Sequence, residues 1–380
     1  MKATHTALAQ TNATMTVLYM AAELGAKYWK LGFAGAAETR VVTVEAWAQD
    51  RVVAAIAKAK ARLGLVPEAR VLAVQEAGRD GFAVHRFFVS LGIESVVVDP
   101  ASIEVPRRSR RAKTDRLDAL KLLALLRRWD HGEKAALRVV HAPTPEEEDA
   151  RQAHRERERL IVARTAHANR LRSLLATMGA APRQVSARLT EVLDRLTCWD
   201  GTALPPQLRA ALRRECERLA VVEEQLRAME AKLTAAAQAP ATTPPARQTE
   251  RLRCLKSVGT ITAHVVAHEF LWRRFRNRRE VGAAAGLVGT PYNSGDSVRD
   301  QGISKAGNGR VRRVMVEAAW LWLRWQPDNA LSRWFHERFG RAGGRSRRVG
   351  IVALARKLLI LFWRIAEFGE VPADVVLHAV

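Results

Sequence analysis

The order of apolar patterns between residues 15 and 129 constrains the fold of this chain more than any other feature. Some segments have the short, β-branched pattern of strands, and others have the longer apolar spacing of helices. The expected strands cover residues 15–22, 28–33, 40–45, 70–74 and 95–98, and the expected helices cover residues 49–63, 81–91 and 114–129. Three strands followed by alternating helices and strands predict a mixed α/β sheet covered by helices.

Positive charge is in excess and is unevenly distributed. The chain has 62 Lys and Arg against 39 Asp and Glu, which gives a formal net charge of +23. Residues 1–140 carry a net charge of +8, residues 141–250 of +2 and residues 251–380 of +13. A general bias toward arginine would not leave the middle nearly neutral. The two flanking segments are therefore expected to bind a polyanion, and nucleic acid is favoured over an anionic membrane surface.

Several classes of protein are excluded by the sequence. The three cysteines form no C-x-x-C pair, so neither a disulfide framework nor a zinc finger is expected. The best apolar stretch, residues 349–368, is interrupted by Arg356 and Lys357, and no transmembrane helix or signal peptide is predicted. We expect a cytoplasmic protein that has no membrane partner.

The middle of the chain is predicted to be a helical spacer. One helix is expected from residue 145 to residue 178, which contains no internal glycine or proline, and a second helix has apolar residues at heptad spacing. That seam consists of Leu208, Leu212, Leu219, Val222, Leu226, Met229 and Leu233. A coiled coil, a surface that pairs with another copy and a plain helical bundle all remain open. The expected parts are residues 1–140, a coiled-coil spacer over residues 141–238, a proline-rich linker over residues 239–250, and residues 251–380.

Four carboxylates stand where such a sheet would bring them together. Glu23 ends the first strand and Glu76 ends the fourth, while Asp115 and Asp118 lie on one face at the start of the last helix. Converging carboxylates repel one another unless cations hold them, and Mg²⁺ or Mn²⁺ suits such oxygen ligands in phosphoryl transfer. Each acid alone is more often a helix cap or a solvated charge, and Asp99 is a competing ligand.

Basic residues flank this site and gather again in the last part of the chain. One group directly precedes the last expected helix of the first part and consists of Arg107, Arg108, Arg110, Arg111 and Lys113. A second group is interleaved with aromatic residues and includes Arg273, Arg274 and Arg276. A third group opens the helix expected over residues 310–325 and consists of Lys305, Arg310, Arg312 and Arg313. All of them are expected to contact nucleic acid.

A glycine-rich stretch over residues 286–308 contains a candidate nucleophile. Ser294 lies between Asn293 and Gly295, and Ser297 is nearby. The stretch has no cysteine and no nearby histidine, so a hydrolase triad is not expected. A loop serine is most often a turn hydroxyl, but the basic residues here would hold a phosphate beside Ser294, which makes it a candidate DNA nucleophile. Upstream, residues 255–263 look like a helix-hairpin-helix turn with Ser257 in place of its usual second glycine.

Separated motifs, in the same order along the chain, resemble the insertion-sequence one-ten family of transposases. The motifs are residues 76–82 (EAGRDGF), 98–102 (VDPAS), 107–118 (RRSRRAKTDRLD), 286–288 (GLV), 292–297 (YNSGDS) and 302–308 (GISKAGN). Members of that family join a ribonuclease-H-like (RuvC-like) DEDD domain to a mainly helical, serine-bearing transposase domain. The resemblance thus implies a DNA recombinase that cuts and rejoins DNA through a serine–DNA intermediate.

The resemblance also assigns residues and partners. It implies that Glu23, Glu76, Asp115 and Asp118 are the metal ligands and that Ser294 is the nucleophile. It further implies a homo-oligomer with a composite active site, a structured noncoding guide RNA, and association with the bacterial nucleoid when DNA is bound. The family usually has Asp at the first ligand place, so Glu23, which is one methylene longer, requires a relaxed metal geometry.

Two other functions remain open from the residues alone. One is a structure-specific nuclease of the Holliday-junction type, in which metal-activated water cuts DNA and Ser294 takes no part. The other is a non-catalytic nucleic-acid-binding protein in which the acids are structural.

Overall fold

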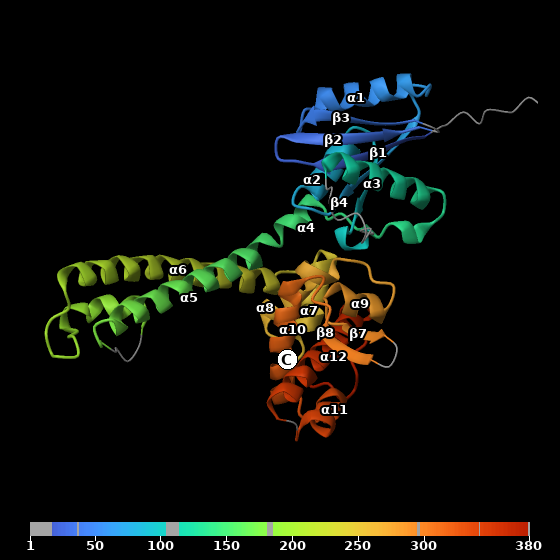
Figure 1. Ribbon diagram of the computed structural model, residues 1–380. Helices are drawn as coiled ribbons and strands as arrows, with labels where there is room; N and C mark the ends of the chain where they lie inside the picture. The colour runs from blue at the N-terminus through green and yellow to red at the C-terminus, as the bar shows by residue number, and fades with distance from the viewer. Residues whose placement is uncertain are drawn as a thin grey trace, which may run out of the picture. The chain divides into compact units, whose positions relative to one another are not determined.

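The computed structural model describes residues 17–35, 38–103, 114–180, 185–294, 297–341 and 343–378. The chain divides into two compact units, Met1–Pro143 and Thr144–Val380 (Figure 1). The boundary falls just before Thr144, which caps the first helix of the second unit.

The first unit is built on a six-stranded mixed sheet. Its strands are β1 (Val17–Leu24), β2 (Tyr28–Ala34), β3 (Thr39–Glu45), β4 (Arg70–Glu76), β5 (Glu94–Val98) and the short β6 (Val139–Val140). The order across the sheet is β3-β2-β1-β4-β5-β6; β1, β4 and β5 are parallel to one another, and the remaining pairs are antiparallel. The expected mixed α/β sheet is confirmed.

Helices cover both faces of this sheet. Side chains of α1 (Gln49–Arg62) and α2 (Gly81–Ser90) share a buried cluster with Leu18, Met20 and Ala22 of β1. The intervening residues of β1, Tyr19 and Ala21, are buried with α3 (Asp115–Asp130) on the other face. This division follows from the two-residue period of a strand, which sends alternate side chains to opposite faces.

The second unit begins with a long helical arm. Residues 145–178, expected as one helix, form α4 (Pro145–Asp149) and α5 (Gln152–Ala176), with a break at Ala150 and Arg151. The break has a physical reason, because the buried Arg151 donates to the Glu147 backbone carbonyl. The long helix α6 (Pro206–Gln238) lies side by side with α5 (Figure 1).

Burial along α6 follows a seven-residue step. The most deeply buried leucines of this helix are Leu212, Leu219, Leu226 and Leu233. The other residues of the expected seam, Leu208, Val222 and Met229, are half-buried. One row of the heptad pattern therefore carries most of the contact, and the second row lies at its margin.

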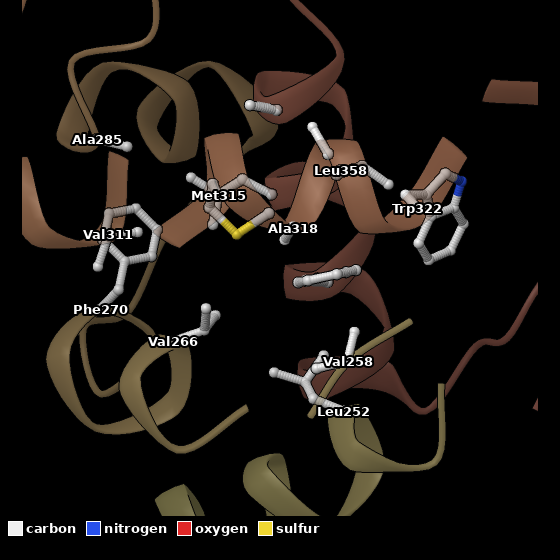
Figure 2. Packing of buried hydrophobic residues seen from close by; sticks show 14 of the residues in the cluster. Leu252, Val258, Val266, Phe270, Ala285, Val311, Met315, Ala318, Trp322 and Leu358 are labelled. Carbon is white, nitrogen blue, oxygen red and sulfur yellow. The ribbon is translucent and has the colours of Figure 1, made fainter. Parts of the chain in front are cut away.

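The rest of the second unit is mainly helical, as expected. Its elements are α7 (Pro244–Arg253), α8 (Thr260–Val266), the π-helical turn η5 (Ala267–Leu271), α9 (Arg278–Ala284), β7 (Gly289–Ser294), β8 (Ser297–Ile303), α10 (Gly309–Trp325), α11 (Ala330–Phe339) and α12 (Gly344–Phe368). The shared core contains Phe270, Met315 and Trp322, each fully buried (Figure 2). The fully buried Phe362 belongs to the same core.

Two segments differ from the expectation. The proline-rich stretch 239–250 was expected to be a linker, yet α7 starts within it at Pro244. The Thr243 side chain accepts a hydrogen bond from the Ala246 amide, and prolines suit the first turn of a helix because their missing N–H has no partner there. The glycine-rich stretch forms the hairpin β7–β8. No helix that the structure describes is long and apolar enough to cross a membrane.

Candidate functional site

Two predicted acids end adjacent parallel strands of the first unit. Ala22 of β1 is the backbone partner of Gln75 of β4. Glu23 directly follows Ala22 and Glu76 directly follows Gln75, so the two glutamates lie at the same level of the sheet. Both continue the alternation that faces α3, since Ala21 and Val74 are buried on that face. Both glutamates are half-buried. We call this end of the α3 face the carboxylate edge.

The N-terminal end of helix α3 is directed to the carboxylate edge. Its last residue, Asp130, accepts a hydrogen bond of 2.7 Å from the Tyr19 hydroxyl and lies 3.7 Å from the Arg70 guanidinium at the start of β4. Ala119, one turn into the helix, packs on Gly32, which is the backbone partner of Ala21. The helix therefore runs from the ends of β1 and β4 toward their beginnings.

The first turn of α3 carries the other two predicted acids. Thr114 caps the helix by accepting a hydrogen bond of 3.4 Å from the Leu117 amide. Asp118 is half-buried and lies one turn before the buried Leu122, so it is on the sheet side of the helix, while Asp115 is exposed. Strand register and helix direction thus place Glu23, Glu76 and the first turn of α3 toward the same end of the sheet.

The donor chemistry of this edge fits a divalent cation, because carboxylate oxygens are hard ligands. Within the described ranges, however, no three His, Cys, Asp or Glu side chains are gathered closely enough to hold a metal ion. The competing ligand Asp99 lies 3.6 Å from Arg138 and is engaged in an ion pair. The basic group expected beside this site lies outside the described residues. It consists of Arg107, Arg108, Arg110, Arg111 and Lys113.

The second candidate site is the hairpin β7–β8, which we call the serine hairpin. Ser294 is the last residue of β7, and its backbone partner across the hairpin is Ser297, the first residue of β8. Both serines therefore stand at the end of the hairpin remote from its attachment to α9 and α10.

Backbone hydrogen bonds join the two motifs that flank the base of the serine hairpin, residues 286–288 and 302–308. The Lys305 amide donates to the Gly286 carbonyl at 3.2 Å, and the Ser304 amide donates to the Val288 carbonyl at 2.9 Å. Gly286 has a φ of +67°, and a Cβ there would lie 2.2 Å from the Ala306 carbonyl oxygen. Glycine is required at this position because any side chain would collide with the opposing loop.

Arg312 also belongs to this interlock. Its guanidinium donates to the carbonyls of Ala285 at 3.1 Å and Lys305 at 3.2 Å. This arginine, predicted to contact nucleic acid, thus joins the two loops at the base of the hairpin. The Lys305 side chain is exposed.

The other predicted basic residues fall into two groups. Arg310 and Arg313 both form ion pairs with Glu158 of α5. On the segment after the π-helical turn, Arg274 is exposed, Arg273 stacks 5.4 Å from the centre of the Trp272 ring, and Arg276 pairs with Glu280. The position of Arg274 at the surface fits contact with nucleic acid, whereas Arg276 is held by Glu280.

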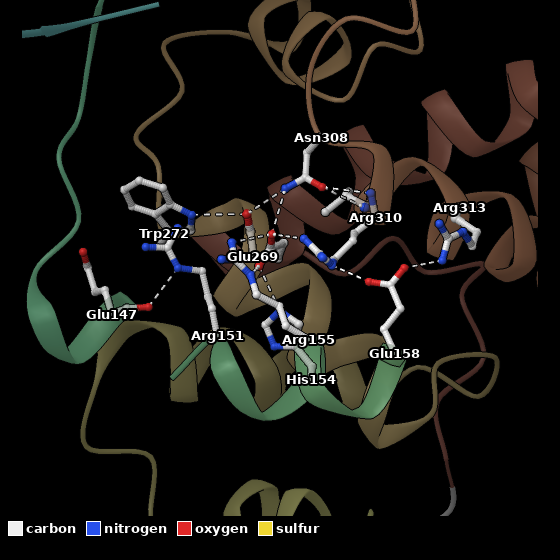
Figure 3. Close-up of polar contacts among 11 residues, drawn as sticks. Glu147, Arg151, His154, Arg155, Glu158, Glu269, Trp272, Asn308, Arg310 and Arg313 are labelled. Atoms are coloured by element: carbon white, nitrogen blue, oxygen red, sulfur yellow. Dashed lines mark hydrogen bonds and ion pairs between the residues drawn. The ribbon is translucent and has the colours of Figure 1, made fainter. Parts of the chain in front are cut away.

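Sequence reasoning missed a buried polar cluster centred on Glu269 of the π-helical turn (Figure 3). The carboxylate is 3% exposed, and it accepts hydrogen bonds from His154 Nε2 at 2.9 Å and from Arg155 at 2.9 and 3.2 Å. Asn308 Nδ2 lies 3.4 Å and Arg310 Nη1 3.5 Å from the same carboxylate. We call Glu269, His154, Arg155, Asn308 and Arg310 the Glu269 cluster.

The surroundings of Glu269 determine its charge. Burial by itself would raise the pKa of this carboxyl, but the hydrogen bonds from His154 and Arg155 outweigh it and lower the pKa to about 2. Burial lowers the pKa of the neighbouring His264 to about 4 and that of His268 to about 3. The one signal of this cluster in the sequence is a charged residue within the apolar run 263–271.

Comparisons with known proteins agree with both units. Residues 249–334 match a family model described as the IS116/IS110/IS902 family of transposases, and residues 49–179 match a DEDD model of the IS110 type described as a transposase. The y4rJ protein of Sinorhizobium fredii, which is named as a transposase, is 42% identical over 322 residues, covering 83% of this chain and 81% of its own length. The transposase for insertion sequence element IS1111A of Coxiella burnetii is 27% identical over 289 residues, or 75% of each chain. The transposase for insertion sequence element IS1328 of Yersinia enterocolitica is 29% identical over 240 residues, covering 61% of this chain and 68% of its own length.

Proposed function

The chain belongs to the IS116/IS110/IS902 family of transposases, and we propose that it moves an insertion sequence with a carboxylate site and a serine nucleophile. The observation that supports the proposal is the position of Glu23 and Glu76 at the same level on adjacent strand ends, with the first turn of α3, which carries Asp115 and Asp118, directed to that end of the sheet.

The first unit is the ribonuclease-H-like (RuvC-like) part of the enzyme. The strand order β3-β2-β1-β4-β5, with β1, β4 and β5 parallel, supports this assignment. The four acids would hold Mg²⁺ or Mn²⁺, which would supply positive charge to the phosphate under attack. Glu23 and Glu76 fix the sheet side of the site, and the capped start of α3 brings Asp118 to the same face.

Ser294 on the serine hairpin is the nucleophile. Its hydroxyl oxygen forms a bond to a DNA phosphorus, the bond from that phosphorus to a deoxyribose oxygen breaks, and the leaving oxygen gains the proton that the serine hydroxyl loses. A second DNA hydroxyl then reverses the exchange, so the phosphodiester energy is retained in the serine–DNA bond. The interlocked base of the hairpin supports this role, because a nucleophile needs a fixed position.

The proposed partners are DNA, a structured noncoding guide RNA and further copies of the chain. Arg274 and Lys305 are exposed basic residues near the serine hairpin in the sequence, and the group over residues 107–113 adjoins the carboxylate site along the chain. The helix pair α7–α8 supports the helix-hairpin-helix interpretation of residues 255–263. The heptad row on α6 supports a coiled coil in the arm.

A DNA-joining assay with single serine variants tests the nucleophile. We expect Ser294→Ala to lose both strand joining and the covalent protein–DNA adduct, while Ser297→Ala, its matched neighbour, retains them. Full joining by Ser294→Ala would refute the serine mechanism, whereas cleavage without joining or an adduct in the wild type as well would favour the metal-dependent nuclease. We expect Asp118→Asn to lose strand cleavage and to keep DNA binding; cleavage at the wild-type rate would leave only a binding role for the acids.

A further inference from the structure

We propose that Glu269 is a positioning residue, which holds the base of the serine hairpin in a fixed place against the first turns of α5. The inference rests on the proposed function, because the position of the hairpin matters for chemistry only if the hairpin carries the nucleophile. Glu269 itself lies in the π-helical turn, not in either candidate site.

One buried carboxylate joins three segments that are far apart along the chain. His154 and Arg155 come from α5, Glu269 from the π-helical turn, and Asn308 and Arg310 from the start of α10. Figure 3 shows these side chains pointing toward one another from the three segments. A buried carboxylate is costly unless its oxygens are fully paired, so each of these partners is held in one arrangement.

Asn308 transmits this arrangement to the hairpin. Its Nδ2 donates to the Glu269 carbonyl oxygen at 3.3 Å, and its Oδ1 accepts hydrogen bonds from the Arg310 and Val311 amides, which caps α10. The Asn308 amide donates to the Ala284 carbonyl at 2.9 Å, at the end of α9. Asn308 is thus both the last residue of the motif 302–308 and a member of the Glu269 cluster.

The π-helical turn is what directs Glu269 into the cluster. An α-helix advances by about 100° per residue, so one residue more or fewer in this turn would rotate Glu269 away from Asn308. Widened turns of this kind are rare and occur often at functional sites. The local backbone of residues 267–271 therefore serves the contact with α5 and α10.

Glu158 adds a second connection between the same two helices. It pairs with both Arg310 and Arg313, one turn apart on α10. These contacts, with the Glu269 cluster, fix the start of the helical arm to the helix that follows the serine hairpin. A motion of α5 would consequently move the base of the hairpin as well.

The test compares two variants that disrupt the Glu269 cluster with a control variant that removes a different ion pair of α5. Glu269→Gln removes the charge and keeps the shape; Asn308→Asp keeps a capping oxygen for α10 but places a like charge beside Glu269. Glu230→Gln is the matched control, because Glu230 pairs with Arg157 of α5 at 2.6 Å without touching the cluster.

Hydrogen exchange measures the positioning directly, and single-turnover cleavage measures its consequence. For Glu269→Gln and Asn308→Asp we expect the amides of residues 304–311 to exchange at least about tenfold faster, with the first unit unchanged. We expect single-turnover cleavage to fall at least about tenfold while the Kd for DNA changes less than about twofold. Glu230→Gln should alter neither.

Three outcomes would overturn the proposal. The first is wild-type exchange over residues 304–311 in both variants, and the second is faster exchange there with unchanged cleavage. The third is an equal effect of Glu230→Gln. If Glu269→Gln does not fold, Asn308→Asp alone decides between these results. Failure of the proposed function shows separately, as a wild-type protein that forms no Ser294-dependent adduct, and the exchange data still judge the connection.

Discussion

His264, which is buried, and His268, which is half-buried, should make the second unit acid-sensitive. His264 is 7% exposed, its ring stacks on that of His268 with centroids 4.1 Å apart, and burial is the main reason that both pKa values are low. In the unfolded chain both imidazoles have an ordinary pKa of 6.5. Below that pH the unfolded state binds protons that the folded state does not bind, so stability is present above pH 6.5 and is lost as the pH falls.

The size of the effect follows from the two pKa values. Each histidine that stays neutral in the folded state lowers the unfolding free energy by about 2 kcal/mol as the pH falls from 8 to 5. The two histidines together lower it by about 4 kcal/mol. Glu269, whose pKa lies near 2, stays ionised throughout this range and adds little to the change.

Urea unfolding of the full chain at several pH values measures this loss. The two histidines together lower the unfolding free energy of the wild type between pH 8 and pH 5, and we expect His264→Phe to keep about half of that loss. The reason is that the unfolded state of the variant binds one proton fewer than that of the wild type. Comparison of the two proteins cancels the contributions of all other titrating groups. The reasoning is refuted if their unfolding free energies fall in parallel between pH 8 and pH 5.

Three further predictions follow from particular contacts. Gly286→Ala forces a Cβ to within 2.2 Å of the Ala306 carbonyl at a positive φ, so we expect a loss of about 2 kcal/mol or more and faster hydrogen exchange confined to the serine hairpin and its base; a variant as stable as the wild type would contradict this. Leu219→Ala empties a fully buried place between α5 and α6 and should cost about 3–5 kcal/mol in urea unfolding, whereas Val221→Ala, at an exposed position of the same helix, should cost less than about 1 kcal/mol; equal costs would mean that the leucine row is not the contact. DNA binding should weaken steeply with salt, because about a thousandfold change in Kd between 50 and 200 mM salt is typical when six or more phosphates are neutralised. An unchanged Kd over this range would contradict the assignment of a basic DNA surface.

The first unit could be predicted well from its sequence because each of its larger elements carries its own local signal. Strand β4, for example, alternates between two buried faces within seven residues, and the expected strand differed from it only at the C-terminal end. Strand β6 was not predicted, since two residues are too few to show a period. The shared edge of Glu23 and Glu76 follows from strand order, which the pattern of elements already implied.

The Glu269 cluster could not be predicted because its partners are far away along the chain. His154 and Glu269 are 115 residues apart, and Glu158 and Arg310 are 152 residues apart. Neither separation leaves a periodic trace in the sequence. The serine hairpin was missed as a pair of strands because its residues are polar and rich in glycine, so the alternation that normally identifies a strand is absent.

Ion pairs reduce the number of arginines in residues 251–380 that are available to bind DNA phosphates. Residues 251–380 carry a net charge of +13, but Arg310 and Arg313 are paired with Glu158, which lies in the nearly neutral middle segment. A cation held by a partly buried carboxylate releases no counterion when DNA binds, unless that ion pair first breaks. The salt dependence of DNA affinity should therefore respond to Arg274→Gln, at an exposed position, more than to Arg313→Gln. If Arg313→Gln instead reduces the slope of log Kd against log salt by about 0.9, the same as Arg274→Gln, then Glu158 does not hold Arg313 in solution.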